Sequence, residues 1–286
     1  MSEYETGAPL TVWPDEPSDQ TKWCCIVACN STTILESNLL ASPDLCAGGV
    51  NVSVQRNKPN AGRAYNQGLD ATSEPIVVFA HQDVYFPKGW KTTLQRKIQY
   101  LNMIDSDWAI AGVMGMTQDE QPKGQLWSTG LGRQIGEAFD APIPACSLDE
   151  VVIILRRASE LRFDEDLPSF HLYGTDIVQT AIQNGYGAYI INAPVVHNSR
   201  AVSILNDGFM SAYRYMQEKW SEALPIRTPV TVINSSGDAP ATTNSWLHKH
   251  RWRRRLRRLP GLIRFAPDGV FGTPRPGPIA RRLRYE

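Results

Sequence analysis

The sequence predicts an α/β fold with a mostly parallel central sheet. Residues 76–80, Ile-Val-Val-Phe-Ala, form an unbroken apolar run of strand length, as expected of a strand that is buried on both faces. Similar runs recur along the chain, and segments of helical length separate them. Strands that alternate with helices are typical of a parallel sheet covered by helices. One domain of this kind plus an extension accounts for 286 residues.

The predicted elements follow one another along the chain. Strands are expected, from apolar runs or from apolar–polar alternation, at residues 23–28, 50–55, 76–80, 108–114, 148–155 and 188–196. Helices are expected between them and after the last strand, at residues 33–40, 62–71, 92–104, 175–183 and 203–220. Residues 117–145 contain four glycines and three prolines, which favours a loop over a functional site.

The composition indicates a reduced, cytoplasmic protein. The five cysteines are an odd number, and Cys24, Cys25 and Cys29 lie in an apolar run that is expected to be buried. No stretch approaches the roughly 20 apolar residues that span a bilayer. The N-terminus has neither the basic region nor the apolar run of a secretory signal.

Charge and composition divide the chain into three predicted parts. These are a flexible N-terminal arm (residues 1–20), the α/β domain (residues 21–225) and a basic C-terminal extension (residues 226–286). From residue 245 onward, Lys and Arg outnumber Asp and Glu by 12 to 2, so this neutral chain combines a basic tail with an acidic body. A basic tail on an acidic body indicates an anionic partner.

The tail has the pattern of an amphipathic helix. Trp252, Leu256 and Leu259 would lie on one face, opposite a face of arginines. Such a helix favours peripheral contact with an anionic membrane, here the inner face. The alternatives are docking on the acidic body of the chain and contact with nucleic-acid phosphates, and nucleic acid is not the favoured partner.

Polar residues follow the central apolar run directly. His81, Gln82 and Asp83 stand at the expected carboxyl end of the strand at residues 76–80. Open α/β sheets bind ligands outside these ends. An aspartate there can hold a divalent cation, and the cation can hold a diphosphate. The alternative is a polar turn in which Asp83 accepts hydrogen bonds from backbone amides.

Two segments of the chain resemble family-2-like glycosyltransferases of the GT-A type. The first fits the family spacing N-x-G-x-x-x-N-x-G-x-x-A before the strand, with Asn60, Gly62, Asn66, Gly68 and Ala71. The family's strand then ends in Asp-x-Asp, of which only Asp83 remains because His81 replaces the first aspartate. The second resembles the acceptor half, with Phe163-Asp-Glu, Tyr173-Gly-Thr-Asp-Ile, Gly185 and His197. Together the resemblance covers roughly residues 23–200.

The resemblance implies a fold and a donor site. The fold would be a GT-A-like three-layer sandwich, and the donor would be a nucleotide-diphosphate sugar. Donor contacts are expected from Asn30, Asn60, Arg63, His81 and Asp83. A divalent metal, Mn²⁺ or Mg²⁺, would be held by Asp83 and His197. For Arg63 the alternative is an exposed helix arginine, and for His197 a hydrogen-bonded histidine at a strand end.

The resemblance also implies a catalytic base, for which Asp176 is the candidate. A carboxylate at this place would take the proton of the acceptor hydroxyl as it attacks the sugar. The alternative is an aspartate that only stabilises the positive end of a helix. The family's Glu-Asp pair is absent, so Asp164, Glu165, Asp166 and His171 remain substitutes.

These expectations combine into a glycosyltransferase. It would move a sugar to a hydroxyl of a glycan or lipid-linked acceptor, with inversion by direct displacement, and the family implies polysaccharide biosynthesis. A nucleotidyltransferase is less favoured, because no glycine- and lysine-rich loop follows the first strand. A non-catalytic nucleotide-sugar- or nucleic-acid-binding protein is the other alternative, since the first aspartate and the glutamate of the family motifs are missing.

Overall fold

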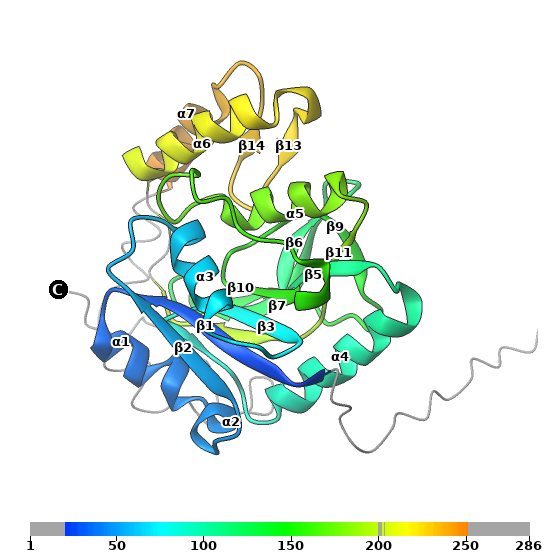
Figure 1. Ribbon diagram of the computed structural model, residues 1–286. Coiled ribbons are helices and arrows are strands. Elements are labelled where there is room, and N and C mark those ends of the chain that lie inside the picture. Colours follow the sequence, from blue (N-terminus) through cyan, green and yellow to red (C-terminus); the bar gives the residue numbers. More distant parts are fainter. Residues whose placement is uncertain (1–20, 200–201, 203, 251–286) are drawn as a thin grey trace, which may run out of the picture.

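A computed structural model describes residues 21–199, 202 and 204–250 of the chain (Figure 1). The strands of the main sheet are β1 (Trp23–Cys29), β2 (Asn51–Arg56), β3 (Ile76–His81), β4 (Val84–Tyr85), β5 (Trp108–Gly112), β6 (Met114–Thr117), β7 (Pro122–Ser128), β8 (Arg133–Gly136), β9 (Ile143–Leu148), β10 (Val152–Arg156), β11 (Gly187–Ile190) and β12 (Val195–His197). The helices are α1 (Thr32–Ser37), α2 (Pro43–Cys46), α3 (Ala61–Asp70), α4 (Trp90–Ile104), α5 (Tyr173–Gln183), α6 (Asp207–Lys219) and α7 (Ala239–Lys249). A separate hairpin consists of β13 (Ile226–Arg227) and β14 (Val232–Ile233).

The central strands of the main sheet are mostly parallel. Its order is β2-β1-β3-β10-β5-β11-β9-β6-β7-β12-β4, and β8 pairs with β7. In the central part, β1 is parallel to both β2 and β3, and β5 is parallel to β11. Only β10, which lies between β3 and β5, runs antiparallel to its two neighbours in that part. The predicted α/β class and the mostly parallel central strands are therefore confirmed.

Helices cover both faces of the central strands because both faces are apolar. Side chains alternate along β1 and β3, so Ile26 and Phe79 enter the core beneath α3, α5 and α6. Val27 and Val78 enter a second core with α1 and α4. Figure 1 shows these two groups of helices on opposite sides of the sheet. The result is a three-layer arrangement in which the carboxyl ends of β1, β2 and β3 open at one edge.

Two predictions about the middle of the chain are wrong, and one of them matters for the site. Residues 117–145 form most of the second half of the sheet, from β6 to β9, and are not a long loop. The single strand expected at residues 148–155 is two strands, β9 and β10, separated by a turn at residues 149–151. Asp149 Oδ1 accepts a hydrogen bond from the Val151 amide at 3.0 Å and closes this turn.

The described part of the predicted C-terminal extension, residues 226–250, packs on the α/β layers. Ile226, Ile233 and Leu247 belong to the same buried cluster as Phe79 and Ile177. The predicted arm at residues 1–20 and the tail at residues 251–286, with Trp252, Leu256 and Leu259, lie outside the described residues. Within the described residues, no helix has both the length and the hydropathy needed to cross a membrane. All five cysteines are free thiols.

Candidate active site

Pairing between β4 and β12 brings Asp83 next to His197, 114 positions later in the sequence. Asp83 directly precedes β4, and in the antiparallel register of the two strands Val84 lies opposite His197. The Asn198 amide also donates a hydrogen bond to the Asp83 carbonyl at 2.9 Å. As a result, His197 Nε2 lies 3.4 Å from Asp83 Oδ1. The two residues that the resemblance names as metal ligands are therefore neighbours in the structure.

His81 completes a cluster of three candidate metal ligands. One ligand atom from each of His81, Asp83 and His197 lies within 4.8 Å of the other two. Among the described residues, the buried His197 Nε2 faces the Asp83 carboxylate at 3.4 Å but has no hydrogen-bond partner, whereas Nδ1 faces the Ser199 hydroxyl at 3.4 Å. A buried nitrogen without a partner beside a carboxylate fits a divalent cation, because coordination would satisfy it. Two imidazoles and a carboxylate form a known type of transition-metal ligand set.

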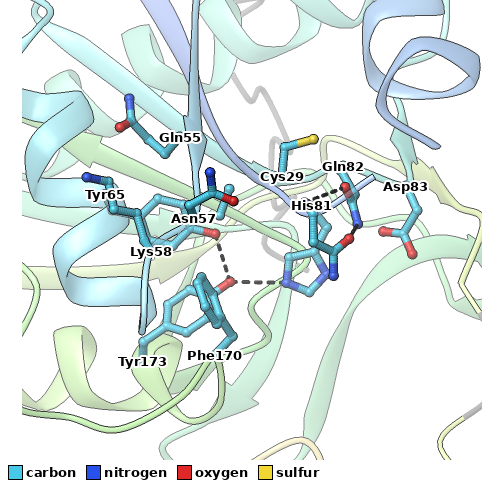
Figure 2. Close-up of a pocket in the computed structure, with 12 residues that line it drawn as sticks. Cys29, Gln55, Asn57, Lys58, Tyr65, His81, Gln82, Asp83, Phe170 and Tyr173 are labelled. Carbon is cyan, nitrogen blue, oxygen red and sulfur yellow. Dashed lines mark hydrogen bonds between the residues drawn. The ribbon is translucent and has the colours of Figure 1, made fainter. Parts of the chain in front are cut away.

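Tyrosines of α3 and α5 orient the ring of His81. Figure 2 shows a chain of hydrogen bonds from the Tyr65 hydroxyl to the Tyr173 hydroxyl (3.2 Å) and on to His81 Nε2 (3.1 Å). The Tyr173 hydroxyl donates to the Glu150 carbonyl at 3.2 Å. Since a tyrosine has one hydroxyl hydrogen, His81 Nε2 then carries a hydrogen and donates to Tyr173. This tautomer leaves Nδ1 of His81 with a free lone pair for a cation.

The charge of Asp83 suits a cation, which would compete with the proton that Asp83 favours on His197. Burial disfavours ionisation of Asp83, but the facing imidazole of His197 outweighs it and lowers the pKa of Asp83 to about 2. Burial lowers the pKa of His81 and favours its neutral form, against the attraction of Asp83. For His197, burial acts in the same direction, but the Asp83 carboxylate is stronger and raises the pKa. Asp83 is therefore an ionised carboxylate at neutral pH.

A cavity of about 370 Å³ opens beside the cluster, at the carboxyl ends of β1, β2 and β3. Its lining residues are Ala28, Cys29, Asn30, Gln55, Asn57, Lys58, Tyr65, His81, Gln82, Asp83, Phe170 and Tyr173. Gln82 joins two of these strand ends, since its Oε1 accepts hydrogen bonds from the Asn30 and Ser31 amides at 3.2 and 3.1 Å. The structure thus brings Asn30, His81 and Asp83 together in one cavity, as expected of donor-site residues.

Asn60 and Arg63 are not among the described residues that line this cavity. Asn60 caps α3, because its Oδ1 accepts a hydrogen bond from the Arg63 amide at 2.9 Å. Its Nδ2 donates to the Glu165 carbonyl at 2.7 Å and ties the helix to that segment. The Arg63 side chain is exposed. Sequence reasoning missed Lys58 instead, although a lysine just after the alternating residues 50–55 is a signal for the mouth of such a cavity.

A second cavity, of about 450 Å³, meets the first at the ligand cluster. It shares His81 and Phe170 with the first cavity and includes His197. Asp149 and Glu150, from the turn between β9 and β10, add two carboxyl groups. The remaining lining residues come largely from the start of α5, from residues around α6 and from the β13–β14 loop. The cluster of His81, Asp83 and His197 therefore lies where two cavities join.

Asp176, the expected base, is buried away from these cavities. Its side chain is 1% exposed and is not among the described residues that line them. The Lys219 ammonium lies 2.8 Å from Asp176 Oδ1, and the Trp220 indole N–H donates to the same oxygen at 2.8 Å. Burial raises the pKa of Asp176, although Lys219 opposes the rise. These contacts indicate that Asp176 joins α5 to α6.

Of the substitutes for Asp176, one reaches the second cavity. Asp164 accepts hydrogen bonds from Lys219 at 2.6 Å and Tyr215 at 2.8 Å, and Glu165 accepts one from Asn66 at 3.0 Å. His171 lines the cavity, and burial lowers its pKa. Of the three acidic substitutes, Asp164 is therefore engaged by Lys219 and Tyr215, whereas Glu165 and Asp166 are exposed at the surface.

Glu150 is the carboxyl group with the most perturbed ionisation in the second cavity. Burial, reinforced by the neighbouring Asp149 carboxylate, raises the pKa of Glu150 to about 8, against hydrogen bonds from the amides of Leu172 and Gly174. A Cβ at Gly174 would lie 2.6 Å from the Leu148 carbonyl oxygen and 3.3 Å from Glu150 Cγ. Glycine at this position therefore allows the β9–β10 turn to approach the start of α5.

Comparisons with known proteins give low similarity. No family model matches the chain. A protein of Fuscovulum blasticum named "ATP synthase subunits region ORF 6" is 28% identical over 170 residues, which cover 57% of this chain and 66% of that protein, just under two thirds of its length.

Two of the solved structures that match this chain contain a nucleotide sugar. S. aureus TarS in complex with UDP-GlcNAc has a TM-score of 0.46 and 14% identity, with 82% of this chain and 72% of that chain covered. A mannosyltransferase from Pyrobaculum calidifontis with GDP-Man and Mn²⁺ has a TM-score of 0.42 and 11% identity, with coverages of 82% and 73%. At these scores the neighbours do not determine what this chain binds.

Proposed function

We propose that this chain is a metal-dependent glycosyltransferase that moves a sugar from a nucleotide-diphosphate donor to an acceptor hydroxyl. The observation that carries the proposal is the cluster of His81, Asp83 and His197 at the junction of two cavities. His81 lines both cavities, so a cation held by this cluster would lie beside the space for a donor and the space for an acceptor. A group-transfer enzyme with two substrates needs such a junction.

The first cavity suits a nucleoside diphosphate. It lies at the carboxyl ends of parallel strands, and its lining includes the amides of Asn30 and Asn57 and the ammonium of Lys58. Amide groups can hydrogen-bond a nucleotide base, and a lysine attracts phosphate as a point charge. A divalent metal on the three ligands would neutralise charge on the departing diphosphate as a Lewis acid.

We assign the base to Glu150 and a structural role to Asp176. Glu150 lines the acceptor cavity, and a pKa of about 8 is close to the pH at which a general base works well. In its ionised form it would accept the proton of the attacking hydroxyl. A base on the acceptor side and a diphosphate on the donor side favour direct displacement, with inversion at the anomeric carbon.

Binding tests the donor site. We expect uridine, guanosine, cytidine or thymidine diphosphate to raise the unfolding temperature in the presence of Mn²⁺, because a ligand at 100 times its Kd adds about 2.7 kcal/mol to stability. Asp83→Ala and His197→Ala should abolish the Mn²⁺-dependent part of this rise. Asp70→Asn, at an exposed surface carboxylate, is the matched control and should keep it. A rise that persists in Asp83→Ala would refute the assignment.

Turnover then separates an enzyme from a non-catalytic binder. Glu150→Gln keeps the size of the side chain but removes the base, so it should retain Mn²⁺-dependent nucleotide binding and lose about 10²- to 10⁴-fold in sugar transfer or donor hydrolysis. The wild-type rate should increase as pH rises toward 8, since only ionised Glu150 accepts a proton. Unchanged turnover in Glu150→Gln would exclude this residue as the base.

A further inference from the structure

Exposed apolar side chains gather around the second cavity. Among the described residues, eight large hydrophobic side chains are exposed, and four of them line this cavity: Phe170 (38%), Val202 (50%), Ile204 (63%) and Val230 (38%). Single exposed apolar residues are ordinary, but several around one cavity mark a binding surface. The other four, Met103, Ile104, Ile182 and Trp246, do not line it.

The polarity of this cavity changes from one part to another. Polar groups lie where it meets the ligand cluster, with His81, His197 and Glu150. Beyond them the wall contains the buried side chains of Leu172, Leu205 and Phe209, and its exposed part carries the four apolar residues. A ligand that matches this wall is polar at the reacting end and apolar along the remainder.

Hydrogen bonds hold one part of the apolar rim, the β13–β14 loop that carries Val230, in place. Thr228 and Thr231 close the β13–β14 loop: the Thr228 amide and hydroxyl both donate to the Thr231 carbonyl, at 2.9 and 2.8 Å. The Thr228 hydroxyl accepts from the Val230 amide at 3.2 Å, so Val230 is fixed at the tip. Ser147 of β9 donates to the Arg227 carbonyl at 2.7 Å and anchors the loop to the sheet. The exposed apolar tip is therefore preformed.

We propose that the second cavity binds an amphiphilic acceptor, in which the hydroxyl-bearing end is attached to a linear apolar chain. This inference rests on the proposed transfer function and names its acceptor class. A free sugar would leave the rim of Phe170, Ile204 and Val230 in contact with water. An apolar chain covers it, and each buried methylene strengthens binding about fourfold, which corresponds to ~0.8 kcal/mol.

A series of alkyl glucosides tests the proposal on the full chain loaded with Mn²⁺ and a nucleoside diphosphate. Methyl, butyl, hexyl and octyl β-glucoside, each below its micelle concentration, are titrated by calorimetry. We expect the affinity to rise at least tenfold from butyl to octyl. Equal affinities along the series would overturn the proposal. Equal affinities are also expected if a segment of the chain itself fills the cavity.

Variants locate the binding. Ile204→Asn and Val230→Asn, both at exposed positions, should flatten the increase from butyl to octyl. Met103→Asn and Ile182→Asn remove equally exposed apolar side chains outside the cavity and should keep the increase. An increase that survives in Ile204→Asn and Val230→Asn would place the alkyl chain elsewhere and overturn the proposal.

The same samples separate this inference from the proposed function. Stabilisation by Mn²⁺ and nucleoside diphosphate depends on Asp83 and His197 and not on Val230. If this stabilisation is present while the glucosides all bind with equal affinity, the acceptor class is wrong and the donor site stands. If the stabilisation is absent while the affinity rises with alkyl length, the cavity binds an apolar ligand and sugar transfer is refuted.

Discussion

The ligand set of the candidate metal centre favours a different metal ion from the one that a pair of aspartates would favour. His81 and His197 supply imidazole nitrogens, and Asp83 supplies the one carboxylate of the cluster. Imidazole binds transition ions well, whereas Mg²⁺ prefers oxygen ligands in octahedral geometry. We therefore expect affinity to increase from Mg²⁺ through Mn²⁺ to Co²⁺, measured by calorimetry with the nucleoside diphosphate present. His81→Asp should lower the ratio of Co²⁺ affinity to Mg²⁺ affinity by at least tenfold. Equal affinities of the wild type for the two ions would contradict this ligand set.

Ionisation of Glu150 predicts how stability depends on pH. Its pKa is about 8 in the folded protein and about 4.3 in an unfolded chain. Between these values the folded state keeps a proton that the unfolded state has lost, so this group makes the protein less stable as pH rises from 5 to 8. In Glu150→Gln that part of the slope disappears. The difference is measured from the unfolding temperatures of both proteins between pH 5 and pH 8.5. If the two plots of unfolding temperature against pH are parallel, the Glu150 carboxyl group does not have a raised pKa.

Residue patterns predicted the candidate metal ligands better than the surroundings of Glu150 and Asp176. Asp83 and His197 were paired through the family resemblance, in which residues that follow two strands hold one metal. Glu150 was missed because residues 148–155 are apolar enough to resemble one strand, and the acidic pair within them is in fact the turn. The family resemblance named Asp176 as the base, and its ion pair with Lys219 could not be predicted because the two residues are 43 positions apart in the sequence.

At the level of elements, the Asn60–Ala71 motif describes how one helix packs. Asn66 holds the Phe163 segment by accepting from its amide at 3.0 Å and donating to its carbonyl at 2.9 Å. A Cβ on Gly62 would lie 2.1 Å from the Asp164 carbonyl oxygen, and one on Gly68 would lie 2.4 Å from the Ile26 side chain. The motif therefore fixes α3 between β1 and the 163–166 segment. It supports the site indirectly, through Tyr65 on the same helix.

Breaking the ion pair between α5 and α6 is predicted to lower the free energy of unfolding. Asp176→Asn removes the charge that faces Lys219, although the amide oxygen can still accept from Trp220 and Lys219 keeps Asp164. We expect a loss of about 2 kcal/mol in the free energy of unfolding. Denaturant titration measures it, with Asp70→Asn as control because its pair with Arg162 is exposed and should matter by less than about 1 kcal/mol. A fully stable Asp176→Asn that loses only sugar transfer would return the catalytic role to Asp176.

At the scale of the molecule, periodicity predicted the layers and not the order of all strands. Buried runs such as β3 and β5 are recognisable because both faces are covered, and the helices between them set the parallel direction. The antiparallel position of β10 and the strands from β6 to β9 depend on long-range pairing. Short strands of this kind, most of which contain a glycine, have no strong local pattern, so a loop was predicted there.

The C-terminal elements give a last prediction about cooperativity. Leu247 on α7 is 5% exposed and belongs to the same buried cluster as Ile233 and Phe79. If residues 226–250 unfold together with the α/β layers, calorimetry should show a single transition. Leu247→Ala should then lower the free energy of unfolding by about 2–4 kcal/mol. Ile182→Ala, at an exposed site, should change it little. Two separate transitions, with only the smaller one shifted by Leu247→Ala, would mean that an independent extension does begin near residue 226. Val230, at the rim of the second cavity, would then be able to detach from the α/β layers.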